Sequence, residues 1–86
     1  MSGTGAGEEA ARFVEGVRFK PVRFRAGYDM SAVDDLLDQL AAAFRAGRPV
    51  RGIVESARFP MVKMREGYAT DEVDVLLAEV LRRDVR

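Results

Sequence analysis

One stretch of this sequence decides the fold: Arg25-Ala26-Gly27-Tyr28-Asp29-Met30-Ser31-Ala32-Val33-Asp34-Asp35-Leu36-Leu37. It recurs as Arg65-Glu66-Gly67-Tyr68-Ala69-Thr70-Asp71-Glu72-Val73-Asp74-Val75-Leu76-Leu77, at an offset of 67 − 27 = 40 residues and without a gap. Between residues 13 and 40, 12 of 28 positions carry the same residue as the position forty later. The chain is therefore one supersecondary unit written twice. The identical positions are Val14, Glu15, Arg18, Phe19, Val22, Arg25, Gly27, Tyr28, Val33, Asp34, Leu36 and Leu37.

The composition limits the classes of protein that this chain can belong to. Its 86 residues, 48% of them hydrophobic, suffice for one small domain or for two half-domains that share a core. The absence of Cys and His removes disulfides, thiol chemistry, the usual zinc ligands and the commonest general base. A formal charge of zero argues against a dedicated nucleic-acid binder. We expect no enzyme, no cofactor and no metal, and we expect no transmembrane or secretory segment, so a cytoplasmic protein.

The neutral total hides a segregation of charge within each repeat. Four cations fall within the eight residues 18–25, which contain no acid, and four acids follow within the ten residues 29–38, which contain no base. The second repeat has the same order in weaker form. Each unit thus has a basic connector followed by an acidic helix start. The residues are Arg18, Lys20, Arg23 and Arg25, then Asp29, Asp34, Asp35 and Asp38, and in the second repeat Arg58, Lys63 and Arg65, then Asp71, Glu72 and Asp74.

The order of elements follows from the spacing of apolar residues and of Gly and Pro. We expect a disordered tail over residues 1–7, repeat 1 over 8–46, a linker over 47–51 and repeat 2 over 52–86. Each repeat begins with a short helix, at 8–17 and at 50–57, and continues through an extended connector that contains a proline. Gly27 and Gly67 are expected to provide a positive φ in a tight turn before the next helix.

The longer helices are expected near 30–46 and 70–84. Each has one apolar stripe that is marginal alone and needs a partner, so we expect the two helices to pack against each other. The segment 47–58 is long enough to run back along a helix, which makes a parallel pairing possible. For the first helix, Asp29 or Ser31 is the candidate N-cap, Ser31 forming a capping box with Asp34; Thr70 is the candidate for the second. The fold class predicted is all-α, with two helix–extended loop–helix repeats packed as a pseudo-two-fold helical domain. The stripes are Val33, Leu36, Leu37, Leu40 and Phe44, and Val73, Leu76, Leu77, Val80 and Leu81.

The segments Phe24 to Asp38 and Arg65 to Leu77, with Gly-Tyr followed by Val-Asp and Leu, resemble the N-terminal motif of the DivIVA family. That family comprises bacterial cell-division and polar-growth scaffolds, and the doubled arrangement is similar to its small repeat-type members in actinobacteria. The resemblance implies a short helix, a crossed loop and a longer helix that enters a parallel coiled-coil dimer. This chain departs from the family pattern, because its helices stop after roughly 15 residues and because Ala69 replaces the usual Asp.

The resemblance also implies a site. In the family the loop carries an exposed apolar residue between basic ones and touches membrane. The corresponding residues here are Phe24 with Arg23 and Arg25, and Met64 with Lys63 and Arg65. Ordinary packing of Phe24 and Met64 in the core is the alternative. The motif residues expected to be structural are Gly27, Tyr28, Val33, Asp34, Leu37, Gly67, Tyr68, Val73, Asp74 and Leu77, with Asp34 and Asp74 capping a helix or pairing with Arg25 and Arg65.

We therefore expect a non-enzymatic module that binds an anionic membrane surface, protein partners or both. The alternative is a protein–protein adaptor or homodimerisation domain without membrane contact. Attraction of the basic connectors to anionic lipid would contribute about 1 kcal/mol per cation near the surface. The corresponding location is the cytoplasm, at the inner face of the cell membrane if the connectors touch lipid.

Overall fold

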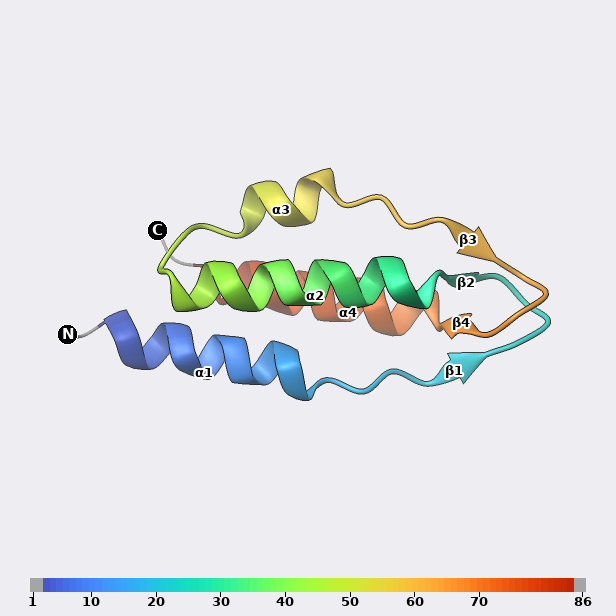
Figure 1. Cartoon of the computed structure of the whole chain (residues 1–86), viewed down its shortest axis with the longest axis horizontal. Helices are drawn as coiled ribbons and strands as arrows, with labels where there is room; N and C mark the ends of the chain where they lie inside the picture. The colour runs from blue at the N-terminus through green and yellow to red at the C-terminus, as the bar shows by residue number, and fades with distance from the viewer. Residues whose placement is uncertain (1–2, 85–86) are drawn as a thin grey trace.

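The computed structural model describes residues 3–84, with four helices and a four-stranded antiparallel sheet (Figure 1). The helices lie side by side at one end of an elongated molecule, and the strands and loops form the other end. Residues 1–2 and 85–86 lie outside the described chain. The elements are α1 (Gly3–Gly16), β1 (Pro21–Val22), β2 (Gly27–Tyr28), α2 (Met30–Arg45), α3 (Arg51–Ser56), β3 (Met61–Val62), β4 (Gly67–Tyr68) and α4 (Thr70–Arg82).

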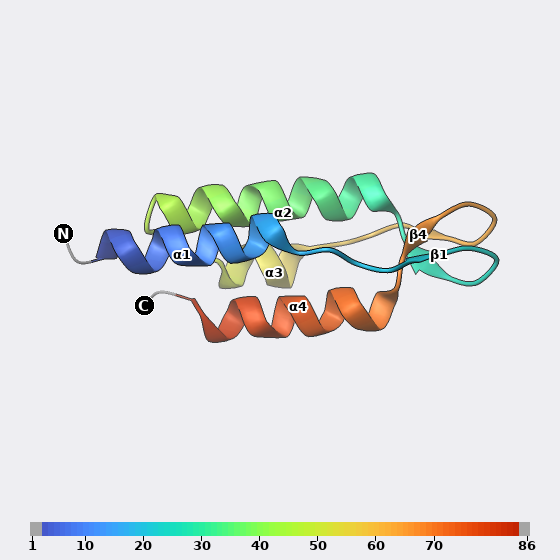
Figure 2. The ribbon, with the colours of Figure 1, turned by 90° about the horizontal axis from the view of Figure 1, so that it is seen from below.

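The four helices keep the order of the sequence repeat. Both α2 and α4 start at the sheet and run in the same direction, whereas α1 and α3 run back toward the sheet on opposite sides of them (Figures 1 and 2). The stripes of α2 and α4 both contribute to one apolar core, but the main helix contact of α2 is with α1, so the expected direct pairing of the two long helices is not the principal contact. The buried members of that core are Ala10, Ala11, Val14, Leu36, Leu40, Ala41, Ala43, Phe44, Val50, Leu76 and Val80.

The all-α prediction is wrong, because the two connectors form a small sheet. Its strand order is β1-β4-β2-β3, so strands of the two repeats alternate across the whole sheet rather than forming two separate hairpins. Each strand has two residues, and β1 pairs with β4, β4 with β2, and β2 with β3, all antiparallel. A two-residue strand is too short to leave an alternating apolar pattern in the sequence. The pairing also joins residues about forty positions apart, which no local pattern reports.

Gly27 and Gly67 are structural for a reason other than the predicted positive φ. They face each other where β2 and β4 cross, and neither has a left-handed φ. A Cβ on Gly27 would lie 3.0 Å from the carbonyl oxygen of Tyr68, and one on Gly67 would lie 2.7 Å from that of Tyr28. Glycine is therefore required here because the two backbones approach closely.

The N-terminal segment is ordered further than predicted. Helix α1 begins at Gly3, so residues 3–7 are helical and the prediction of a disordered tail fails over them; Met1 and Ser2 lie outside the described residues. At Gly7 a Cβ would collide with the backbone carbonyl of Phe44, which shows how closely α1 lies against α2. This packing supplies the stabilisation that a glycine-rich helix start lacks by itself.

The N-cap of α2 is one of the two predicted residues, whereas the N-cap predicted for α4 is wrong. Asp29 is the N-cap of α2, and its carboxylate accepts the N–H of Ala32 at 2.9 Å, whereas the predicted capping box of Ser31 with Asp34 does not form. In α4 the N-cap position is occupied by Ala69, which has no side-chain acceptor, and Thr70 is already helical. The short second helix covers Arg51–Ser56, inside the predicted 50–57.

Candidate binding surface at the loop end

The two loops that follow β1 and β3 form one continuous end of the molecule. They project beyond the sheet side by side, at the end opposite to both chain termini (Figure 2). The N–H of Phe24 donates a hydrogen bond of 3.1 Å to the carbonyl of Lys63, which joins the two tips. The sequence placed these residues in separate repeats, and the fold brings them together. We call residues 23–26 and 63–66 the loop end.

Both predicted apolar residues of the loop end point into solvent. Phe24 is 74% exposed and Met64 is 79% exposed, so the packing alternative is wrong for both. Large apolar side chains with this exposure do not stabilise the fold, and they lie among charges. The exposed charged residues beside them are Arg23, Arg25, Lys63 and Arg65, with Glu66 as an acid.

The backbone of Phe24 has an unusual conformation. Its φ is 66°, the only left-handed value at a non-glycine residue between residues 3 and 84. A bulky side chain in this region of φ costs on the order of 1–2 kcal/mol. The fold tolerates this cost at a residue whose ring makes no contribution to the core, and observed strain of this kind is often found at functional sites.

The cations of the two loops differ in their partners. Arg65 forms an ion pair with Asp29 of the other repeat, with 2.9 Å between the nitrogen and the oxygen. The equivalent acid for Arg25 is missing, because position 69 is Ala, and within residues 3–84 Arg25 forms no ion pair. Three of the four cations are thus without an acidic partner in the described chain. Arg18, by contrast, lies away from the loop end and donates to the carbonyls of Glu15 and Val17.

The two motif tyrosines connect the repeats below the loop end. Tyr28 donates its hydroxyl to Asp74, and Tyr68 donates to Asp34, each at 2.9 Å. The expected pairing of these aspartates with Arg25 and Arg65, or as helix caps, is therefore wrong. The bond to Asp74 raises the pKa of the Tyr28 hydroxyl, and burial together with Asp34 raises that of Tyr68. Each ring also packs on a phenylalanine of the other repeat, Phe59 or Phe19, with ring centroids 4.9 and 5.0 Å apart.

The other structural motif residues divide by burial. Val33 and Val73 are fully buried. Leu37 and Leu77, which were expected to be structural, are half-buried and pack against the core. Their neighbours Leu36 and Leu76, each 6% exposed, take the buried positions instead.

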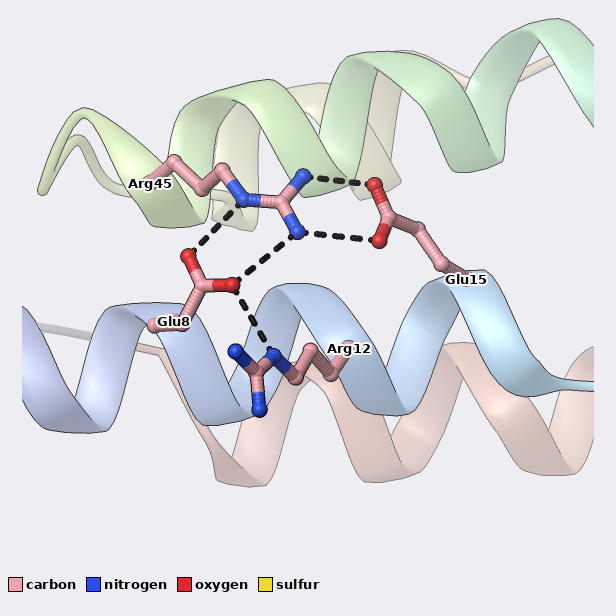
Figure 3. A network of polar contacts seen from close by, with 4 residues as sticks. All are labelled: Glu8, Arg12, Glu15 and Arg45. Carbon is pink, nitrogen blue, oxygen red and sulfur yellow. Dashed lines mark hydrogen bonds and ion pairs between the residues drawn. The ribbon is translucent and has the colours of Figure 1, made fainter.

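A polar network on the opposite end of the molecule was not predicted. Arg45 of α2 donates to Glu8 and to Glu15 of α1, and Arg12 donates to Glu8 at 3.0 Å (Figure 3). These bonds lower the pKa of both glutamates and raise that of Arg45. The one signal in the sequence was the spacing of Glu8 and Glu15, seven residues apart on one helix face. The network joins α1 to α2 and leaves the loop end untouched.

The described chain shows no arrangement for metal chemistry and no membrane-crossing helix. Between residues 3 and 84, no group of three or more acidic residues is placed to hold a metal ion. In the same part of the chain, none of the helices combines the length and the apolar character needed to cross a membrane. No protein-family model, no curated protein and no solved structure matches this chain.

Proposed function

We propose that this chain is a non-enzymatic module of the DivIVA type that binds anionic membrane surfaces through its loop end. The single observation that carries the proposal is the joint exposure of Phe24 and Met64 at one end of the molecule, among four cations. Protein binding by the same surface, without lipid, is the alternative. The resemblance of the repeated motif to DivIVA supports a role in bacterial cell division or polar growth.

The mechanism combines two contributions that are weak when taken alone. Each basic residue near an anionic surface contributes about 1 kcal/mol, and this part is screened beyond roughly 8–10 Å at physiological salt. Each apolar side chain adds roughly 1.5–3 kcal/mol on burial in the lipid. Arg23, Arg25 and Lys63 are available for the first contribution, and Phe24 and Met64 for the second.

The left-handed backbone at Phe24 supports a binding role for this side chain. Glycine or asparagine would occupy a φ of 66° at lower cost, and the ring contributes nothing to the core. A phenylalanine at this position therefore lowers the stability of the fold and presents an exposed apolar ring to solvent. Both properties are consistent with a side chain that contacts a ligand.

Co-sedimentation with anionic vesicles tests the proposal. The parent protein should sediment with phosphatidylserine-containing vesicles at low salt and less at high salt. The variant Phe24→Ala with Met64→Ala should bind at least tenfold more weakly with an unchanged thermal melt, because both side chains are exposed. The matched control is Val75→Ala, which removes an apolar side chain that is 69% exposed on α4, outside the loop end.

The charge contribution has its own matched pair of variants. Arg23→Gln with Lys63→Gln should weaken vesicle binding and reduce its salt dependence, whereas Arg48→Gln with Arg51→Gln, at the other end of the molecule, should not. A parent protein that stays in the supernatant with anionic vesicles at low salt would refute the membrane proposal and favour the protein adaptor.

A further inference from the structure

The side of the molecule formed by α1 and the connector after it carries two apolar grooves. They lie on either side of Phe19, one toward α2 with a volume of about 390 Å³ and one toward α4 with about 510 Å³. Either volume is many times the roughly 10–15 Å³ that one water needs, so each groove has room for a large side chain. We call this side the acidic face, because its rim consists of Glu15, Asp34, Asp38, Asp71, Glu72 and Glu79.

The rim keeps much of its negative charge. Glu15 and Glu79 form ion pairs with arginines, but Asp38 and Asp71 have no cationic partner within residues 3–84. Arg18 is the one basic residue among the described residues that line the grooves, and its guanidinium is tied to two backbone carbonyls. The acidic face is therefore a surface of negative potential with an apolar floor.

The repeat supplies an internal comparison for this face. The equivalent side around Phe59 carries three acids, Asp35, Glu55 and Asp74, where the acidic face has six. The exposed Val75 borders the groove toward α4, and the equivalent residue on α2 is Asp35. The acidic face is thus both more acidic and more apolar than the equivalent side around Phe59.

We propose that the loop end of one copy docks on the acidic face of a second copy. The loop end has two apolar side chains, Phe24 and Met64, flanked by cations, and the acidic face has two apolar grooves flanked by acids. The two surfaces are complementary in charge, and a chain with a net charge of zero does not repel its own copies. The loops project beyond the sheet, away from the helices and the connector that carry the acidic face, so a chain cannot make this contact with itself (Figure 1).

The geometry of such a contact determines the form of the assembly. The two surfaces differ, so the contact is heterologous, and each docked copy offers a free acidic face or a free loop end to the next. The assembly therefore grows by head-to-tail addition, as a ring if the rotation between successive copies closes and as an open chain if it does not. It depends on salt, because charges at the rim of an interface act mainly on association and are screened.

Sedimentation velocity over a range of concentrations tests the proposal. At low salt the weight-average mass of the full chain should rise with concentration, and high salt should return it to that of one chain. A face variant, Asp38→Lys with Asp71→Lys, should stay a single chain. Its matched control, Asp35→Lys with Glu55→Lys, makes the same change of net charge on the side around Phe59 and should associate as the parent does.

A mixing experiment distinguishes this contact from a symmetric one. A loop variant, Phe24→Ser with Met64→Ser, and the face variant should each remain a single chain. An equimolar mixture should form a species of two chains and nothing larger. In each pair, the face variant supplies the only functional loop end and the loop variant supplies the only functional acidic face. The proposal is overturned if the parent stays a single chain at low salt, if the control variant fails as the face variant does, or if the mixture contains no two-chain species.

The face variant also separates this proposal from membrane binding. It alters no residue of the loop end, so it should sediment with anionic vesicles at least as well as the parent. Loss of self-association with intact vesicle binding is the result expected for the face variant. A parent that binds vesicles but never associates would refute the contact between copies and leave the membrane proposal standing.

Discussion

The two repeats differ in their first helices, α1 and α3, but they make the same contacts where their connectors cross in the sheet. Helix α1 has 14 residues and buries Ala10, Ala11 and Val14 against α2, whereas α3 has six residues, none of them buried. In contrast, the glycines, tyrosines and aspartates at the sheet make equivalent contacts in both repeats. The crossing of the connectors is thus the part of the motif that fixes the fold, and the short helices are adapted to different tasks.

The difference has a local cause. Position 7 is Gly within α1 and allows close approach to Phe44, whereas the equivalent Gly47 has a φ of 71° and ends α2. Pro49 follows, and because proline disfavours a helical conformation at the residue before it, helix α2 cannot continue through this segment. The next helix, α3, begins at Arg51. The chain between α2 and α3 must turn here, and α1 has no such constraint.

The largest expected loss of stability concerns the residues that hold the two short helices in place, Phe44 for α1 and Asp84 for α3. Phe44→Ala should lower the free energy of unfolding by about 3–5 kcal/mol, because the ring is 1% exposed and lies beneath α1. The equivalent residue, Asp84, accepts the N–H of Val50 ahead of α3, so Asp84→Ala should cost only about 1 kcal/mol. Urea unfolding measures both values, and equal losses would contradict the contrast between α1 and α3.

The glycines at the crossing should behave alike in both repeats. Gly27→Ala and Gly67→Ala should each destabilise the fold by about 1–3 kcal/mol, because the added Cβ meets the opposing backbone. Gly52→Ala is the control, since its Cβ enters open space within α3, and it should stabilise the protein by about 0.5–1 kcal/mol. A neutral result at either crossing glycine would show that the strands can separate there.

A smaller effect concerns the cap that only the first repeat possesses. Asp29→Ala should cost about 0.5–2 kcal/mol, because it removes the cap of α2 and also the partner of Arg65. Ser31→Ala, at the other predicted cap, should leave the thermal melt unchanged because it is exposed. If the two variants melt at the same temperature, the cap contributes nothing and the two repeats start their long helices equally well.

The smallest effect concerns the acid dependence of the Arg45 network. The pKa values of Glu8 and Glu15 are lowered in the folded state, so their contribution is present above the ordinary value of about 4.5 and is lost as pH falls through the folded pKa. Thermal melts between pH 7 and pH 3 should therefore fall less steeply for Glu15→Gln than for the parent. Glu55→Gln, the equivalent change in repeat 2, removes only an exposed pair within α3 and should follow the parent curve.

Sequence alone determined those features of this protein that depend on local spacing. The forty-residue repeat, the stripes of the two long helices and the positions of the loops are all readable from residue types and their intervals. The sequence limited the N-cap of α2 to Asp29 or Ser31, and the structure decided for Asp29. The placement of Val75 outside the stripe of α4 was readable in the same way. The exposure of Phe24 was not decided by spacing, since an apolar residue in an extended connector is as compatible with packing as with contact to a ligand.

Only the tertiary structure decided the contacts between the repeats. The exchange of strands, the close approach at Gly27 and Gly67, and the bonds from Tyr28 to Asp74 and from Tyr68 to Asp34 join residues that are roughly forty positions apart. Two-residue strands carry no period, and a side-chain hydrogen bond between distant residues leaves no interval in the sequence. Such features depend on how the chain folds back on itself, which local propensity does not determine.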